Sequence, residues 1–503
     1  MRSNACLESL FAKYSLILCL QIELMADISQ IKNGERMTLR QQVALTAKLS
    51  WPAIIAQLST ILMQYIDASM VGRLGADQSA SVGLMNSSLW MFWGVCSMIT
   101  MGFSVQVAHL LGAGNESGAR AVLKQGITAC LVAGSVIAAL GAAIAFPLPH
   151  WLGGDDAICS GATVYFLTFV SALPILIMNY LAGGMLRCAG NMTVPGILNV
   201  AMCLFDVVFN FFLIFPTRDI SLAGSVVTVP GAGLGVFGAA LGTVCAEILC
   251  ASAMLYYLCR RQKGLSLIGA DHRGGYRPTR AVLKRAFRIA VPMTAEHIIF
   301  CGAQITITLI VAPLGVVAIA ANAFAVTAES LCYMPGFGIG EAATTLCGQS
   351  YGAGRYPLVR RFCYLTTLLG MAIMTVMAVI MYLCAPFMMS IMTPVAEIAE
   401  AGTQVLRIEA FAEPMYAASI VAYGAFVGVG DTLIPAIMNF GSIWLVRIPL
   451  AAILAPTLGL QGVWIAMAAE LTFRGIIFLL RMRGKSWLKP GRAPAAPDPL
   501  PEV

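Results

Sequence analysis

Charged residues are scarce in this chain of 503 residues: they make up 11% of it, against 59% for hydrophobic residues. A soluble domain carries about 25% charged residues, so this composition, with a mean hydropathy of +0.83, excludes a soluble globular protein. The net charge of +7 comes from basic residues in loops between apolar runs and forms no nucleic-acid-binding pattern. The sequence therefore predicts a protein of the lipid bilayer with no nucleic-acid partner.

Signatures of catalysis, ATP use and disulfide bonding are also missing. The four histidines show neither an H-E-x-x-H motif nor clustering, and there is no G-x-x-x-x-G-K-S/T loop. Many of the 15 cysteines lie inside apolar runs without paired spacing, which is typical of small buried side chains. An integral membrane enzyme is thus a distant alternative, and we expect no cofactor and no ATP-driven step.

Long apolar runs, in contrast, fill most of the chain. A membrane-spanning helix needs roughly 20 mostly apolar residues, and about twelve such runs lie between residues 47 and 482. Each is too long for a barrel strand, so we expect helices whose backbone groups are satisfied internally. The predicted fold is an all-α integral membrane protein with twelve transmembrane helices.

The two halves of the chain repeat one another at a constant spacing of 240 residues, as Pro52 and Pro292 show. The same spacing separates Gln64 from Gln304, Gly112 from Gly352, Arg120 from Arg360, Pro195 from Pro435 and Asn199 from Asn439. Six spans per copy give both copies the same orientation. The sequence therefore predicts two six-helix bundles related by a pseudo-two-fold axis along the membrane normal, an arrangement that suggests a transporter.

Basic residues gather on one side of the predicted spans. Nine Lys and Arg residues lie between positions 260 and 288, and only Arg73 and Arg218 lie on the opposite side. By the positive-inside rule both termini are cytoplasmic, and we expect a multi-pass monomer in a bacterial inner membrane. The expected segments are a cytoplasmic N-terminal segment (1–39), a first bundle (40–262), a cytoplasmic linker (263–281), a second bundle (282–483) and a disordered cytoplasmic tail (484–503).

Four motifs rich in glycine and proline stand out in the sequence. They are Asp67-Ala-Ser-Met-Val-Gly-Arg-Leu-Gly75, Met334-Pro-Gly-Phe-Gly338, Gly190-Asn191 with Pro195, and Gly430-Asp431-Thr432 with Pro435. Together they resemble the motifs of the MATE (multidrug and toxic compound extrusion) transporters. The resemblance covers roughly residues 40–483. It implies a secondary active exporter, in which H⁺ or Na⁺ drives antiport of amphipathic, cationic organic compounds out of the cytoplasm. A lipid-linked oligosaccharide or lipid flippase of the same superfamily is the alternative, although we expect a flippase to ring its cavity with Arg.

Comparison of the two copies singles out four polar residues of the first. Each has an apolar counterpart in the second copy. The pairs are Asp67 and Ile307, Asp206 and Val446, Asn210 and Leu450, and Thr243 and Met467. The last pair has a spacing of 224, because the preceding loop is 16 residues longer in the first copy.

These four residues are predicted to lie at one height in the membrane. Asp67 and Asn210 each follow a proline by 15 residues, which places them about 22 Å along their helices. Thr243 lies about 12 Å from the outer end of its helix, and Asp206 shares a helix face with Asn210. Desolvation disfavours a charged carboxylate, so such a group can take up a proton outside and release it inside. Because the oxygen atoms also suit Na⁺, we predict a cation-coupling site here and no other metal site.

The resemblance points to the same residues. In the DinF branch of MATE proteins, an Asp on helix 1, an Asn/Asp pair on helix 5 and a Thr on helix 6 form the cation site. The chain therefore looks closer to the DinF branch than to the NorM branch. Its helix-5 order, Asp206 before Asn210, is reversed from that pattern, which leaves H⁺ and Na⁺ both open.

The second copy carries carboxylates of its own, of which Glu296 and Glu413 are the leading candidates. In the NorM branch, acidic residues on helices 7 and 10 carry coupling, and alignment places those positions at Phe300 and Tyr416. Glu296 and Glu413 each lie about one turn earlier.

Two roles stay open for Glu296 and Glu413. They either bind substrate and serve as secondary coupling groups, or they form structural ion pairs with Arg407 and Arg447. The repeated glutamines, Gln64 and Gln304, are further candidates for substrate contact. The 27 Met and 23 Phe residues could line an adaptable pocket, but packing and lipid contact account for most of them.

Overall fold

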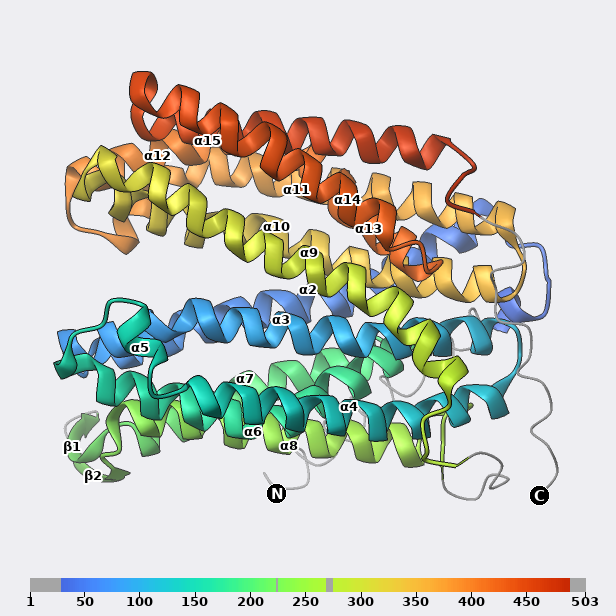
Figure 1. Cartoon of the computed structure of the whole chain (residues 1–503), viewed down its shortest axis with the longest axis horizontal. Helices are drawn as coiled ribbons and strands as arrows, with labels where there is room; N and C mark the ends of the chain where they lie inside the picture. Colours follow the sequence, from blue (N-terminus) through green and yellow to red (C-terminus); the bar gives the residue numbers. More distant parts are fainter. Residues whose placement is uncertain (1–28, 223–224, 268–274, 489–503) are drawn as a thin grey trace.

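The computed structural model of the chain describes residues 29–222, 225–267 and 275–488. Its helices lie side by side along the long axis of the molecule (Figure 1). Of the remaining residues, 223–224 belong to the expected first bundle and the others to the expected N-terminal segment, linker and tail. Expectations for residues 1–28, 268–274 and 489–503 lie outside the described residues.

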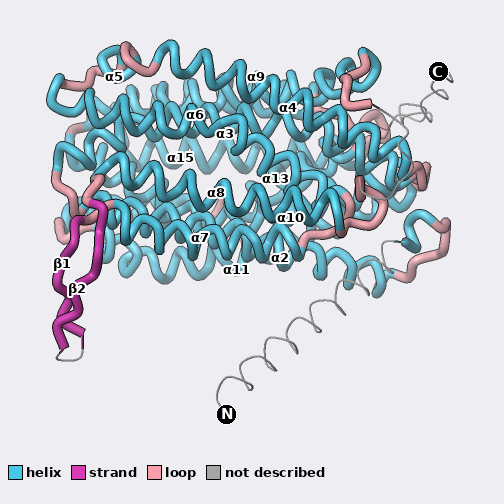
Figure 2. Tube along the Cα trace, turned by 90° about the horizontal axis from the view of Figure 1, so that it is seen from below, coloured by secondary structure: helices cyan, strands magenta, loops and turns pink. Residues whose placement is uncertain are grey.

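Between Leu39 and Arg260, the described residues of the first half form seven helices and a β-hairpin. The helices are α2 (Leu39–Gly72), α3 (Ala76–Gly112), α4 (Glu116–Ile144), the short α5 (Leu148–Trp151), α6 (Asp156–Cys188), α7 (Thr193–Leu213) and α8 (Gly235–Arg260). Strands β1 (Pro216–Leu222) and β2 (Ser225–Ala232) pair antiparallel between α7 and α8. They project from one end of the helical body (Figure 2). We call this end the hairpin end.

The second half has the same order of long helices without a hairpin. Its elements are α9 (Arg280–Val311), η1 (Ala312–Leu314), α10 (Val316–Gly352), α11 (Tyr356–Met392), α12 (Ala396–Ala410), α13 (Glu413–Gly428), α14 (Leu433–Ser442), the π-helical turn η2 (Ile443–Arg447) and α15 (Ile448–Arg483). The end opposite the hairpin holds the connection from α8 to α9 (Figure 1). We call it the basic end.

Glycines that repeat at 240 residues set the same turns in both halves. Gly190 follows α6 and Gly430 follows α13, with φ angles of 87° and 79°. Residues with a Cβ atom rarely adopt this left-handed backbone conformation, which explains why both positions are glycine. The repeat seen in the sequence is thus a repeat of backbone geometry.

Twelve membrane crossings can be traced in the described part of the chain. Ten helices are long and apolar enough to span a bilayer, and α12 and α13 form an eleventh span with a bend of 59°. The segment Leu433–Arg483 counts twice, because its backbone leaves the helical conformation at Gly459 and the chain folds back. Arg447 before this point therefore contacts Glu470 after it, although a straight helix would separate them by about 34 Å. The predicted all-α, twelve-helix membrane fold is confirmed.

The halves of the chain contact each other most closely near the basic end. Leu45 and Leu49 of α2 pack in the same buried cluster as Ile339 and Leu346 of α10. Conversely, Ala286 of α9 belongs to the core of the first half. The first helix of each half thus packs against the other half at the basic end.

Candidate functional site

Three of the four predicted cation-site residues form one hydrogen-bonded cluster near the hairpin end. The side-chain amide of Asn210 on α7 donates to Oδ1 of Asp67 on α2, at 2.9 Å. The same amide donates to Oδ2 of Asp206, one turn earlier on α7, at 3.2 Å. The carboxyl groups of Asp67 and Asp206 also approach each other closely enough to share a proton.

Thr243 of α8 completes the cluster from a third helix. Its hydroxyl donates to the carbonyl oxygen of Ala239 at 3.2 Å and also lies within reach of the Asp206 carboxylate. The neighbouring residue permits this approach: a Cβ atom on Gly242 would lie 2.1 Å from Oδ1 of Asn210. Glycine therefore lets α8 pack directly against the polar face of α7.

The cluster has spare acceptor capacity away from water. Asp206 and Asn210 are 0% and 1% exposed, and among the described residues neither Oδ1 of Asp206 nor Oδ1 of Asn210 has a hydrogen-bond partner. Buried polar atoms are normally paired, so these two oxygens suit a proton or a small cation. No group of three or more His, Cys, Asp or Glu side chains suited to a metal ion occurs within the described ranges.

The equivalent positions of the second half have no such chemistry. Ile307, Leu450 and Met467 pack against the apolar core of that half. At these positions the first half therefore holds a polar cluster, whereas the second half holds packed apolar side chains. The role of the four residues in coupling stays a prediction.

A fifth polar residue lies beside this cluster and was not predicted from the comparison of the two sequence copies. Glu247 of α8 lies one turn beyond Thr243, and its Oε2 accepts a hydrogen bond of 2.6 Å from the side-chain amide of Asn179 on α6. The same comparison contained the signal, because Glu247 corresponds to Leu471 at the spacing of 224.

In the second half, Glu296 is held by two hydrogen bonds. Tyr423 of α13 donates its hydroxyl to Oε2 of Glu296 at 2.6 Å, and Asn439 of α14 donates its amide to Oε1 at 2.5 Å. Glu296 is thus a fixed acceptor between three helices, and neither Arg407 nor Arg447 pairs with it in the described structure.

Glu413 lies in a different cluster, with Glu329 and Glu409 nearby. The Glu413 side chain is fully buried beside the thiol of Cys332. Its carboxylate has no nitrogen or oxygen partner among the described residues. The structure therefore does not bring Glu296 and Glu413 together.

The arginines considered as their partners make other contacts. Arg407 lies over the ring of Tyr382, with 5.3 Å from its guanidinium carbon to the ring centroid. Arg447 and Arg474 both bind the carboxylate of Glu470, at 2.7 and 2.8 Å. This buried Arg–Glu–Arg group was not anticipated from the sequence.

A cavity of about 80 Å³ lies beside this group. Glu329, Tyr416, Arg447 and Arg474 contribute polar atoms to it, and Gln304 of the repeated glutamine pair also lines it. Its counterpart Gln64 is partly buried on α2, one turn before Asp67.

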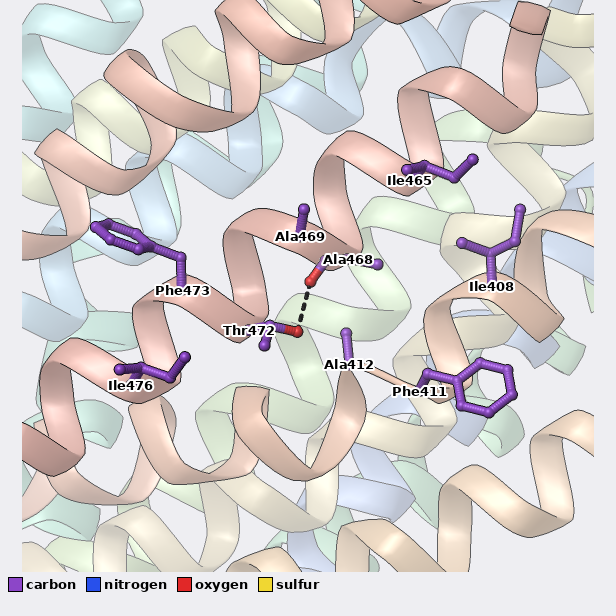
Figure 3. A pocket seen from close by; sticks show the side chains of 9 residues that line it. All are labelled: Ile408, Phe411, Ala412, Ile465, Ala468, Ala469, Thr472, Phe473 and Ile476. Carbon is purple, nitrogen blue, oxygen red and sulfur yellow. Dashed lines mark hydrogen bonds between the residues drawn. The ribbon is translucent and has the colours of Figure 1, made fainter.

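A larger groove of about 520 Å³ opens on the outside of the second half, between α15, the end of α12 and the bend that follows α12. Figure 3 shows its apolar lining, including Phe411, Ile465 and Phe473. The hydroxyl of Thr472 bonds to its own helix at Ala468, at 2.8 Å. The groove offers no polar grouping for an ion and lies away from the Asp67 cluster.

Known proteins match this chain along most of its length. The probable multidrug resistance protein NorM of Thermotoga maritima is 26% identical over 444 residues, 88% of this chain and 92% of the relative. The uncharacterized transporter YisQ of Bacillus subtilis is 24% identical over 453 residues, 88% and 95% of the two chains.

Solved structures share the fold. A multidrug resistance MATE family transporter of the MOP superfamily, in an outward-facing conformation, has a TM-score of 0.79 at 21% identity. The match covers 87% of this chain and 94% of that one. A MOP superfamily transporter from Pyrococcus furiosus has a TM-score of 0.80 at 19% identity, covering 90% and 96%.

The family model named MatE matches residues 52–212 and, separately, residues 292–453. These two matches fall on the two copies of the repeat and together cover more than half of the chain. The chain therefore belongs to the MatE family of membrane transporters.

Proposed function

We propose that this protein is a proton-coupled antiporter that exports amphipathic, cationic organic compounds from the cytoplasm. Protonation of the Asp67–Asp206 cluster from the outside would release substrate outward, and release of the proton inside would reset the transporter. The relatives named multidrug resistance proteins support the export of drugs. The ion and its site are inferred from the cluster itself.

The observation that carries the proposal is the close approach of two carboxyl groups around one amide. Asn210 donates to both carboxylates, and two like charges in a buried site disfavour double ionisation. The cluster therefore suits one proton shared between Asp67 and Asp206. Intramembrane carboxylates are rare because they are costly, and they generally serve transport.

The proposed orientation places the basic end in the cytoplasm, together with both ends of the chain. The concentration of Lys and Arg between positions 260 and 288 supports it. We further propose a DinF-type site in the first bundle, although several relatives carry the NorM name. The NorM-type positions hold Phe300 and Tyr416, which cannot serve as carboxylate ligands.

The test is ethidium efflux from cells that express the protein, with protonophore addition and Na⁺ removal as the variables. We expect Asp67→Asn to abolish energised efflux while the protein still inserts in the membrane at wild-type amounts. Asp77→Asn is the matched control, because Asp77 is exposed in the first turn of α3. Normal ethidium export by Asp67→Asn would contradict the proposal. Efflux that requires Na⁺ and continues in the presence of the protonophore would show that the coupling ion is Na⁺ and not H⁺.

The second candidate, a flippase for lipid-linked oligosaccharides, keeps one argument in its favour. Arg447 and Arg474 do line the small cavity of the second half. Both are already bound to Glu470, however, so neither is available as an unpaired cation for a phosphate group. Ethidium efflux that depends on Asp67 separates the exporter from the flippase.

A further inference from the structure

A row of polar side chains runs between α6 and α8, from the cation cluster towards the basic end. We call it the polar seam; its members are Thr243, Glu247, Asn179, Tyr180 and Arg187. Thr243 and Glu247 lie four residues apart on α8 and therefore share one face of the helix. Their spacing along the axis is about 6 Å. Glu247 is close enough to Asp206 for their charges to repel. The first step away from the cluster is thus another carboxylate.

The partner of Glu247 continues the seam on α6. Asn179 donates to Oε2 of Glu247 at 2.6 Å, while Oδ1 of Asn179 is buried and has no hydrogen-bond partner among the described residues. A buried acceptor that is left without a partner carries a desolvation cost. Its position beside the carboxylate suits a protonated group or a water molecule in passage.

Two turns further along α6 the seam reaches Arg187. The side chain of Arg187 folds back over Gly183, where a Cβ atom would lie 3.4 Å from its guanidinium. Tyr180 lies near both Glu247 and Arg187, so its side chain lies in the interval between them. Polar side chains therefore follow α6 from the level of Glu247 to the basic end.

The seam ends where the two halves of the chain meet. Nε of Arg187 lies 3.5 Å from Oε2 of Glu341 on α10, and Gln57 of α2 donates to Oε1 of the same carboxylate at 3.5 Å. The side chains of Arg187 and Glu341 are 22% and 24% exposed. This contact is therefore the inner end of the seam and joins the first half of the chain to the second.

We infer that Glu247 is a relay group for the coupling proton, taking it from the Asp67–Asp206 cluster and passing it along the seam, past Arg187, to Glu341. In this step the O–H bond at the Asp206 carboxyl breaks and an O–H bond forms at Glu247, so the cluster becomes negative and Glu247 neutral. The O–H bond at Glu247 then breaks and an O–H bond forms at the Glu341 carboxylate, which releases the proton to water on the basic side. The inference rests on the proposed function, because it assumes that the coupling ion is H⁺.

Asn179 is the positioning residue of this relay. Its amide holds the Glu247 carboxylate on the α6 side of α8, facing the seam. The remainder of the seam needs no titration of Arg187, whose guanidinium stays charged and favours the negative form of Glu341.

The test uses the full chain reconstituted in liposomes with an imposed pH gradient. We expect Glu247→Gln, which keeps the shape but cannot carry a proton, to slow gradient-driven ethidium transport at least tenfold. Equilibrium binding of ethidium to the purified variant should stay within twofold of wild type. Glu247→Asp should restore transport to within threefold of wild type, and the solvent deuterium isotope effect on transport should grow in this variant because proton transfer becomes limiting.

Separate outcomes overturn the relay and the proposed function. Transport by Glu247→Gln at half the wild-type rate or more, with Asp67→Asn inactive, overturns the relay and leaves the proposed function standing. Loss of ethidium binding in Glu247→Gln without rescue by Glu247→Asp also overturns it, because Glu247 would then be structural. Normal transport by Asp67→Asn overturns both.

Poor accumulation of Glu247→Gln does not end the test, because Asn179→Ala addresses the same step. This variant keeps the Glu247 carboxylate but removes the group that positions it. We expect transport to fall about threefold to tenfold with unchanged ethidium binding, and wild-type transport by Asn179→Ala would contradict the relay.

Discussion

Gln349 of α10 donates its side-chain amide to the backbone carbonyl oxygen of Cys188, the last residue of α6, at 2.8 Å. The position 240 residues earlier makes the matching contact: Nε2 of His109 lies 2.7 Å from the carbonyl oxygen of Gly428, the last residue of α13. Cys188 and Gly428 are themselves 240 residues apart. Each bond joins one half of the chain to the other at the basic end. Equivalent residues of the two copies therefore make equivalent contacts between the halves.

Loss of either bond should loosen the basic end. In Gln349→Ala the buried carbonyl of Cys188 loses its donor, which costs about 1–3 kcal/mol. Because about 1.4 kcal/mol is a factor of ten in an equilibrium, the fraction of molecules in which the basic end is open should rise roughly 5-fold to 150-fold. The thiol of Cys188, 2% exposed, is the reporter: its labelling by N-ethylmaleimide in membranes, followed by peptide mass spectrometry, should speed up accordingly.

His109→Gln is the control for this measurement, because it keeps a donor and makes the two contacts alike. Its Cys188 labelling should stay within twofold of wild type. Unchanged labelling in both Gln349→Ala and the double variant with His109→Ala would show that these bonds do not hold the end closed.

The same crossing of α3 and α10 depends on glycine. A Cβ atom on Gly112 would lie 2.1 Å from the carbonyl oxygen of Gln349, and one on Gly352 would lie 2.0 Å from that of His109. Gly112→Ala must therefore push the helices apart, and overpacking of this kind costs about 1–3 kcal/mol. We expect the thermal unfolding midpoint of the purified protein to fall by about 1 °C per kcal/mol, because the entropy of unfolding grows with the length of the chain.

Gly83→Ala provides the comparison on the same helix, since no atom lies within 4 Å of the position its Cβ would take. It should leave the unfolding midpoint unchanged or raise it slightly, because Ala favours helix over Gly. Equal effects of the two substitutions would mean that the close approach at Gly112 is not under steric control.

The sequence predicted the fold because its signals are local and repeated. Apolar runs set the helices, and glycines such as Gly190 and Gly430 set their ends. The polar cluster of Asp67, Asp206 and Asn210 was predicted because all three stand where the other copy is apolar.

Contacts that depend on tertiary geometry were beyond this reasoning. The bond from His109 goes to a backbone carbonyl, and no side-chain pattern marks such an acceptor. The meeting of Arg447 and Glu470 requires the reversal at Gly459. The sequence places the boundary between two spans there, but it does not show which side chains meet across the boundary. Pairing between distant helices is fixed by packing, and a single sequence does not contain those distances.

The buried Arg–Glu–Arg group yields the largest expected effect on stability. Glu470 is 0% exposed and accepts from Arg447 at 2.9 and 2.7 Å and from Arg474 at 2.8 and 2.8 Å. Glu470→Ala leaves two guanidinium groups without their shared partner in the interior. Removal of one member of a buried ion pair costs about 3–5 kcal/mol, so thermal unfolding in detergent should shift well below that of wild type.

Two comparisons separate this cause from simple loss of side-chain volume. Glu397→Ala removes an exposed carboxylate from α12 and should change stability by less than about 1 kcal/mol. The triple variant Arg447→Leu, Glu470→Leu and Arg474→Met removes all the buried charges together and should recover most of the stability lost in Glu470→Ala. If the triple variant is as unstable as Glu470→Ala, the loss of stability comes from lost packing and not from unpaired charge. Recovery of stability in the triple variant would show that Glu470 stabilises the second half by neutralising the two arginines beside the cavity.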